Sequence, residues 1–90
     1  MEQLLPHIQI STDESGRVFL VVGDYELFDY IDDYLSDSFD IVYEYRKSAE
    51  RVGGEIITMY FPSHISIAHL KSAVSSLTAD EVEEIYHLNN

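Results

Sequence analysis

With 17 acidic residues against 5 Lys and Arg among 90, the chain has a formal net charge of -12, which disfavours contact with nucleic acid or anionic membranes and favours basic partners. This length and a hydrophobic content of 46% fit one folded domain, residues 1–90, and exclude a disordered acidic tail. The chain has no cysteine for disulfides or thiolate sites, no signal-like start and no membrane-length apolar run, so we expect a cytoplasmic protein.

The first predicted element is a β-hairpin formed by residues 7–11 and 17–22. Apolar and polar residues alternate in the first segment, the second is rich in β-branched residues, and the polar run TDESGR between them is typical of a turn. A turn centred near Glu14 predicts a core face made by Ile8 with Leu20, Ile10 with Val18, and Val22, and a reverse face that carries Phe19 and Val21.

A helix is predicted from Tyr25 to about Ser36. Asp24 is a typical N-cap, because its carboxylate can accept a hydrogen bond from a free backbone N–H of the first turn. An apolar stripe recurs at helical spacing and consists of Leu27, Phe28, Ile31, Tyr34 and Leu35. The opposite, almost wholly anionic face carries Glu26, Asp29, Tyr30, Asp33 and Asp37, with Tyr25 and Asp32 on a flank.

A second hairpin is predicted from residues 39–46 (FDIVYEYR) and 55–61 (EIITMYF), joined by the loop KSAERVGG. A loop centred near Glu50 gives a core face on which Phe39, Ile41, Tyr43 and Tyr45 pair with Phe61, Met59, Ile57 and Glu55. The reverse face then carries Asp40, Val42, Glu44, Ile56, Thr58 and Tyr60.

Two short helices complete the chain. Pro62 ends the last strand, and the apolar spacing that follows predicts a helix beginning near Ser66. Thr78 and Glu81 form a capping-box pattern before a final helix.

The expected fold is α+β in the order β-β-α-β-β-α-α, with a four-stranded antiparallel sheet from two β-hairpins and helices packed on one face. The order of the hairpins within the sheet stays open.

The segment from Asp24 to Glu44 concentrates the charge of the chain, with eight carboxylates and six aromatic rings in 21 residues and no Lys or Arg. Like charges lie three or four residues apart on the first helix, and each such pair costs about 0.2 to 0.5 kcal/mol. Asp32, Asp33 and Asp37 also lie in or just past the last predicted turn, where the helix dipole disfavours anions. A face kept only for solubility would tolerate lysines, so this concentration favours a binding role.

The acids of the last predicted helix occupy a different position. They cluster in its first turns, where the dipole favours negative charge, and comprise Asp80, Glu81, Glu83 and Glu84. These acids have an ordinary structural explanation that most of the first helix lacks. Asp40 and Glu44 are expected on a strand that faces away from the first helix, so they fall outside its surface.

Tyrosine supplies the second part of the binding prediction. Tyr30 is expected on the acidic face, and an exposed tyrosine among carboxylates suits an arginine-rich partner through cation–π contacts. The tyrosines expected to pack inward are Tyr34, Tyr43, Tyr45 and Tyr86. The predicted partner-binding residues are Glu26, Asp29, Tyr30, Asp33, Asp37, Tyr25 and Asp32.

Catalytic and metal-binding patterns are absent from the sequence. It contains no nucleophile motif, glycine-rich phosphate loop, zinc-protease motif or calcium loop. The histidines do not have the spacing of a zinc ligand set; they are His7, His64, His69 and His87. We therefore expect no enzymatic activity, no metal and no cofactor.

Size, acidity and tyrosine content favour a small acidic binding protein that neutralises or inhibits a basic partner, as an immunity protein or antitoxin does for a nuclease-type toxin. Two alternatives stay open. The acids could mimic nucleic acid and inhibit a restriction or CRISPR complex, or the chain could form a homodimer through an open sheet face that carries Phe19, Val21, Val42, Ile56 and Tyr60. None of these hypotheses requires direct contact with nucleic acid or membrane.

Overall fold

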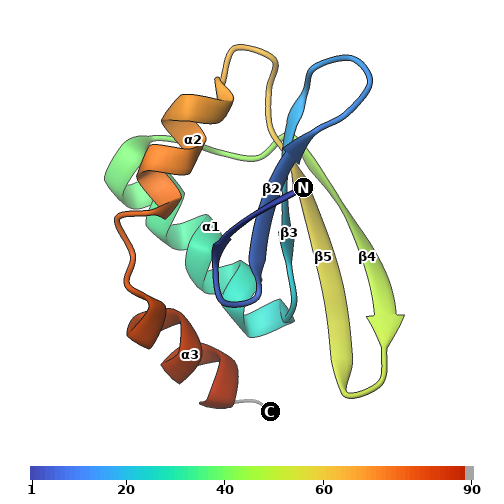
Figure 1. The fold of residues 1–90 in the computed structure, drawn as a ribbon, viewed down its shortest axis with the longest axis vertical. Coiled ribbons are helices and arrows are strands. Elements are labelled where there is room, and N and C mark those ends of the chain that lie inside the picture. The colour runs from blue at the N-terminus through green and yellow to red at the C-terminus, as the bar shows by residue number, and fades with distance from the viewer. Residues whose placement is uncertain (89–90) are drawn as a thin grey trace.

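The computed structural model describes residues 1–88 and shows a five-stranded antiparallel sheet with three helices on one side of it (Figure 1). The elements in chain order are β1 (Glu2–Leu5), β2 (Ile8–Thr12), β3 (Val18–Val22), α1 (Tyr25–Phe39), β4 (Tyr45–Arg51), β5 (Gly54–Tyr60), α2 (Ile67–Val74) and α3 (Ala79–Leu88). The strand order is β1-β2-β3-β5-β4. The α+β class is confirmed, whereas the four-stranded sheet and the order β-β-α-β-β-α-α are wrong.

The additional strand is β1, which the sequence analysis missed. It pairs with β2 through a two-residue connection, Pro6 and His7, and the pairing shifts register between Gln3 and Leu5. Proline restricts the first turn position, and His7 adopts the left-handed region with φ of 65°. Four residues with an irregular register give too short an alternation to predict a strand. Among residues 1–88, no helix is both long and apolar enough to cross a membrane.

The β2–β3 hairpin has the predicted core face but a different register. Ile8 lies opposite Val22 and Ile10 opposite Leu20, which places the centre of the connection at Ser15 instead of Glu14. The side chain of Asp13 explains the shift, because its Oδ1 accepts hydrogen bonds from the backbone N–H groups of Ser15 at 2.9 Å and Arg17 at 3.0 Å. These bonds stabilise a loop at residues 13–17, one position later than the predicted strand bounds leave.

The second hairpin contradicts its prediction. Helix α1 continues to Phe39, residues 40–44 form no strand, and β4 begins only at Tyr45, opposite Tyr60. A tight turn at Val52 and Gly53 closes the hairpin, with Gly53 at φ of 86°. The segment predicted as a loop therefore supplies most of β4. On the open sheet face, Tyr45 joins Tyr60, and Val42 does not belong to this face.

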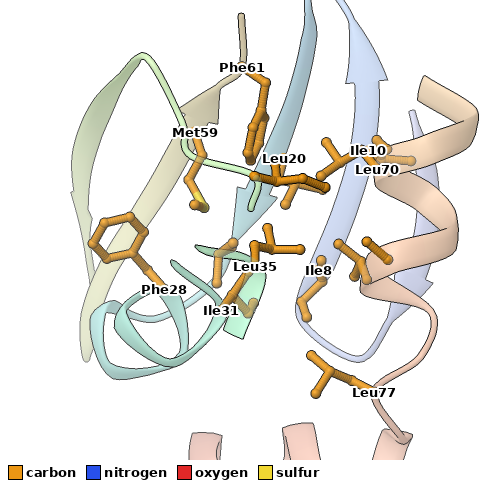
Figure 2. Packing of buried hydrophobic residues seen from close by; sticks show 14 of the residues in the cluster. Ile8, Ile10, Leu20, Phe28, Ile31, Leu35, Met59, Phe61, Leu70 and Leu77 are labelled. Carbon is orange, nitrogen blue, oxygen red and sulfur yellow. The ribbon is translucent and has the colours of Figure 1, made fainter. Parts of the chain in front are cut away.

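The hydrophobic core lies between the sheet and the helices (Figure 2). Alternate residues of β2, β3 and β5 point into it, and α1 contributes Leu27, Phe28, Ile31 and Leu35. Figure 2 shows Leu20, Ile31 and Leu35 near its middle, with Phe61 toward one end and Leu77 toward the other. Ile41 is also buried, although it lies outside any strand.

The predicted helix starts are confirmed. Asp24 caps α1 by accepting a hydrogen bond from Leu27 N, and the Ser66 hydroxyl caps α2 by accepting one from His69 N at 3.1 Å. The capping box of α3 is complete, because Glu81 N donates to Thr78 Oγ1 at 3.1 Å and Thr78 N donates to Glu81 Oε1 at 3.2 Å. These caps fix where each helix begins and thus which of its faces is outward.

Candidate functional site

The candidate site is the outward face of α1. Burial of the apolar stripe against the sheet fixes the rotation of the helix about its axis. The face opposite the stripe is exposed at four of the predicted positions, Glu26, Asp29, Asp33 and Asp37. The structure therefore places these carboxylates in one row along the helix, as their spacing predicted.

The row extends close to the C-terminal end of α1. Asp37 lies in the last turn, which contains no basic residue, and Asp40 is the C-cap with φ of 56°. Because α1 ends three residues later than expected, Asp32 and Asp33 lie before its last turn. The unfavourable interaction with the helix dipole therefore falls mainly on Asp37 and Asp40.

Tyr30 is not fully exposed on the acidic face, contrary to expectation. The side chain is half-buried at the edge of the core, and its ring stacks on that of Tyr34 with centroids 6.4 Å apart. Its hydroxyl lies 3.5 Å from Glu81 of α3. Burial raises the pKa of the Tyr30 phenol, and the nearby charge of Glu81 raises it further. Tyr30 thus belongs to the contact between α1 and α3.

This contact adds Glu81 to the candidate site. The α3 carboxylate is exposed and lies beside Tyr30, although its main role is in the capping box. Sequence reasoning assigned it only that structural role, and its distance of 51 residues from Tyr30 gave no local signal. We name the combined set, Glu26, Asp29, Asp33, Asp37 and Glu81, the α1–α3 acidic surface.

The other flank of α1 faces β4. Arg46 lies over the rings of Phe28 and Tyr25, with its guanidinium carbon 4.8 and 5.5 Å from their centroids. Burial raises the pKa of the Asp32 carboxyl, the negative charges of Asp33 and Asp29 raise it further, and Arg46 partly opposes them. Tyr25 and Asp32 therefore border the acidic surface beside a cation that the sequence analysis did not place there.

Asp24 and Glu44, two other acids of the 24–44 segment, have local partners. Asp24 is buried at the N-cap, and Glu44 Oε1 lies 2.6 Å from Arg17 Nη1. Asp40 and Glu44 lie outside any strand, contrary to expectation, yet neither joins the row of α1. Within residues 1–88, Glu2, Glu44 and Glu83 form ion pairs, and none of the four carboxylates of the α1 row does. The four α1 carboxylates of the row thus have no neutralising cation in the described structure.

Tyrosines predicted to pack inward divide between two environments. Tyr34, Tyr43 and Tyr86 are half-buried, whereas Tyr45 is 43% exposed and stacks on Tyr60 of the open sheet face. The inward role of Tyr45 is therefore wrong. The cause is the later start of β4, which reverses the face on which Tyr45 was expected.

A cavity of about 380 Å³ opens on the side of the sheet away from α1. Its lining includes Arg51, which donates hydrogen bonds to the Gly23 carbonyl oxygen and to the Tyr86 hydroxyl. Residues of the α1–α3 acidic surface do not line it. Within the part of the chain that the structure describes, no group of three or more His, Asp or Glu side chains is arranged to hold a metal ion.

Comparison of the chain with family models, curated proteins and solved structures finds no match. The chemistry of the α1–α3 acidic surface is therefore the basis for a functional proposal.

Proposed function

We propose that the chain is a small acidic binding protein that neutralises a basic protein, acting as an immunity protein or antitoxin against a nuclease-type toxin. The supporting observation is the exposed row of four α1 carboxylates with no cation to neutralise them. Such a row costs folding energy through like-charge repulsion, and a basic partner would remove that cost on binding.

The proposed mechanism is occupation of a substrate cleft. From Glu26 to Asp37 the row spans about 16 Å of helix, given a rise of 1.5 Å per residue. Carboxylates along this length can accept paired hydrogen bonds from arginines that otherwise hold the phosphates of a nucleic acid. The net charge of -12 would also accelerate encounter with a basic partner at low salt.

An aromatic anchor at this surface is supplied by Tyr25 in place of Tyr30. The Tyr25 ring is 42% exposed and borders the acidic row, whereas the Tyr30 ring is engaged with Tyr34. Arg46 already lies over the Tyr25 ring at 5.5 Å. This contact shows that the ring can receive a guanidinium group, and a partner arginine could bind there in the same manner.

Affinity capture from lysate of the source cells tests the proposal. The tagged wild-type chain should retain a basic protein at low salt and lose it as salt increases, and the chain should inhibit the nuclease activity of the retained protein. The variant D29K/D33K should weaken this capture by about tenfold or more, because both reversals place cations against the basic cleft. Circular dichroism would establish that the variant remains folded.

The matched control is E2K/E14K, which makes the same change in net charge at two exposed positions away from α1. It should retain the partner more strongly than D29K/D33K does. Equal loss from both variants would show that net charge alone determines capture and would contradict a site on α1. If duplex DNA competes for the retained protein and that protein lacks nuclease activity, the nucleic-acid-mimic alternative is supported instead.

A further inference from the structure

Strand β4 forms a free edge of the sheet. It pairs with β5 on one side, and its other side faces no element of the described structure (Figure 1). The strand runs for seven residues, of which all but Arg51 are exposed. An edge of this kind presents unpaired backbone N–H and C=O groups on which another strand can pair.

Charges of opposite sign lie at equal distances on either side of the centre of β4. Arg46 and Glu50 lie two residues to either side of Ser48 and share the face of the strand that points toward the helices. Charged side chains on an edge strand often prevent pairing, because they bring like charges together. Around Ser48 they do the opposite, since each Arg46 would face a Glu50.

We propose that β4 pairs antiparallel with β4 of a second copy of this chain, about a two-fold axis at Ser48. The pairing joins the two sheets into one continuous sheet. It sets Arg46 opposite Glu50 of the second copy twice, once on each side of the axis. The other facing residues are Tyr45 with Arg51, Lys47 with Ala49, and Ser48 with itself.

Other two-fold registers of the same strand bring like charges face to face. An axis at Arg46, Lys47 or Glu50 places that residue opposite its own copy. An axis at Ala49 places Lys47 opposite Arg51 twice. Only the Ser48 axis avoids every like-charge pair while including the full length of β4, so the charge pattern specifies one register.

Contacts within the chain favour the position of Arg46. Its guanidinium lies over the Phe28 ring at 4.8 Å, on the face of the sheet that Glu50 of the second copy would share. Arg51 is engaged with Gly23 and Tyr86, so its pairing with Tyr45 is a minor part of the proposal. The two pairs of Arg46 with Glu50 are the determining contacts.

Sedimentation equilibrium of the full chain in about 0.15 M salt, which screens the repulsion between two acidic copies, tests the proposal. The wild type should approach twice the chain mass of 10.4 kDa as concentration rises. R46E and E50R each create two like-charge pairs and should raise the dissociation constant by about tenfold or more. The charge-swapped double variant R46E/E50R should restore the wild-type constant.

Mixing the two single variants gives the most discriminating result. In a heterodimer of R46E with E50R, both facing pairs again have opposite charge, so dimers should form in the mixture while each variant alone remains monomeric. A variant that simply misfolds would show no such recovery. The controls K71E and E2R make the same charge changes away from β4, E2R on the strand at the opposite edge of the sheet, and should dimerise as the wild type does.

Three results would overturn the proposal. The wild type could remain at 10.4 kDa up to a concentration of about 1 mM. The single variants could dimerise as well as the wild type, which would place any dimer on the open sheet face instead. The mixture of R46E and E50R could fail to recover. None of these results bears on α1, whose proposed function is tested by D29K/D33K.

Discussion

Helices α1 and α3 are both acidic, but they place their carboxylates differently along the helix axis. In α3, Asp80 and Glu81 lie in the first turn, where the dipole stabilises them, and Glu81 completes the capping box. In α1 only Glu26 lies in the first turn, and Asp37 lies in a last turn without a basic residue. Position on a helix therefore separates acids with a structural role from acids whose role must be sought outside the fold.

If caps, and not acidity as such, stabilise these helices, Asp24→Ala should destabilise α1. Asp24 is 6% exposed, and its Oδ2 accepts the hydrogen bond from Leu27 N at 3.2 Å. The variant should lose about 1 to 2 kcal/mol of unfolding free energy in urea titrations. Asp24→Asn keeps an acceptor oxygen and should lose less; an equal loss would show that the charge contributes more than the cap.

Thr78→Ala makes the same test at α3, with a smaller expected effect because this cap is exposed. The variant removes the acceptor of Glu81 N and should lose about 1 kcal/mol in the same titrations. It also removes the hydroxyl hydrogen bond to Glu81 Oε1, whereas the hydrogen bond from the backbone N–H of residue 78 remains. If stability does not change, the capping box is not a source of helix stability, and the structural explanation of Glu81 fails.

Replacing Asp37 or Asp80 with lysine tests directly whether the position of a charge along its helix determines its effect on stability. D37K places a cation in the last turn of α1 and removes repulsion with Asp33, so it should gain roughly 0.3 to 1 kcal/mol. D80K places one in the first turn of α3 and should lose a similar amount. Thermal unfolding of the two variants should therefore shift in opposite directions; shifts of the same sign would remove the distinction between the two helices.

Parts of the fold that depend on local signals could be predicted from the sequence. The caps at Asp24, Ser66 and Thr78 follow from side chains that bond to backbone N–H groups within three residues. The exposed acids of α1 follow from the helical period of its buried stripe. These features require no knowledge of how distant segments pack.

Strand β4 could not be predicted in this way. Its residues are almost all exposed on both faces, so no alternation of apolar and polar side chains marks it. The neighbouring run from Phe39 to Tyr45 does alternate, yet Ile41 is buried there without a strand. The same alternation of apolar and polar residues therefore occurs in a segment that is not part of the sheet.

The neighbours of the candidate site also required the tertiary structure. Tyr30 meets Glu81, and Tyr25 meets Arg46, only because α3 and β4 are folded against opposite sides of α1. The helical period places both tyrosines on the flanks of the stripe, but it gives no information on what covers each flank. The sequence therefore predicted the acidic row more accurately than its borders.

Asp32→Asn has the smallest expected effect on stability and tests whether ionisation of this half-buried carboxyl opposes folding. Its pKa is raised above 3.8 by burial and then by Asp33 and Asp29, so ionisation of this carboxyl opposes folding. Asp32→Asn should raise the unfolding free energy at pH 7, and this gain should vanish as the pH falls below the value of 3.8 expected for the unfolded chain.

Asp13→Asn is the opposite control, because hydrogen bonding from Ser15 lowers the pKa of Asp13. That variant should lose stability at pH 7, and its loss should also vanish in acid. Urea titrations across this pH range would contradict the electrostatic cost if Asp32→Asn were destabilising at pH 7.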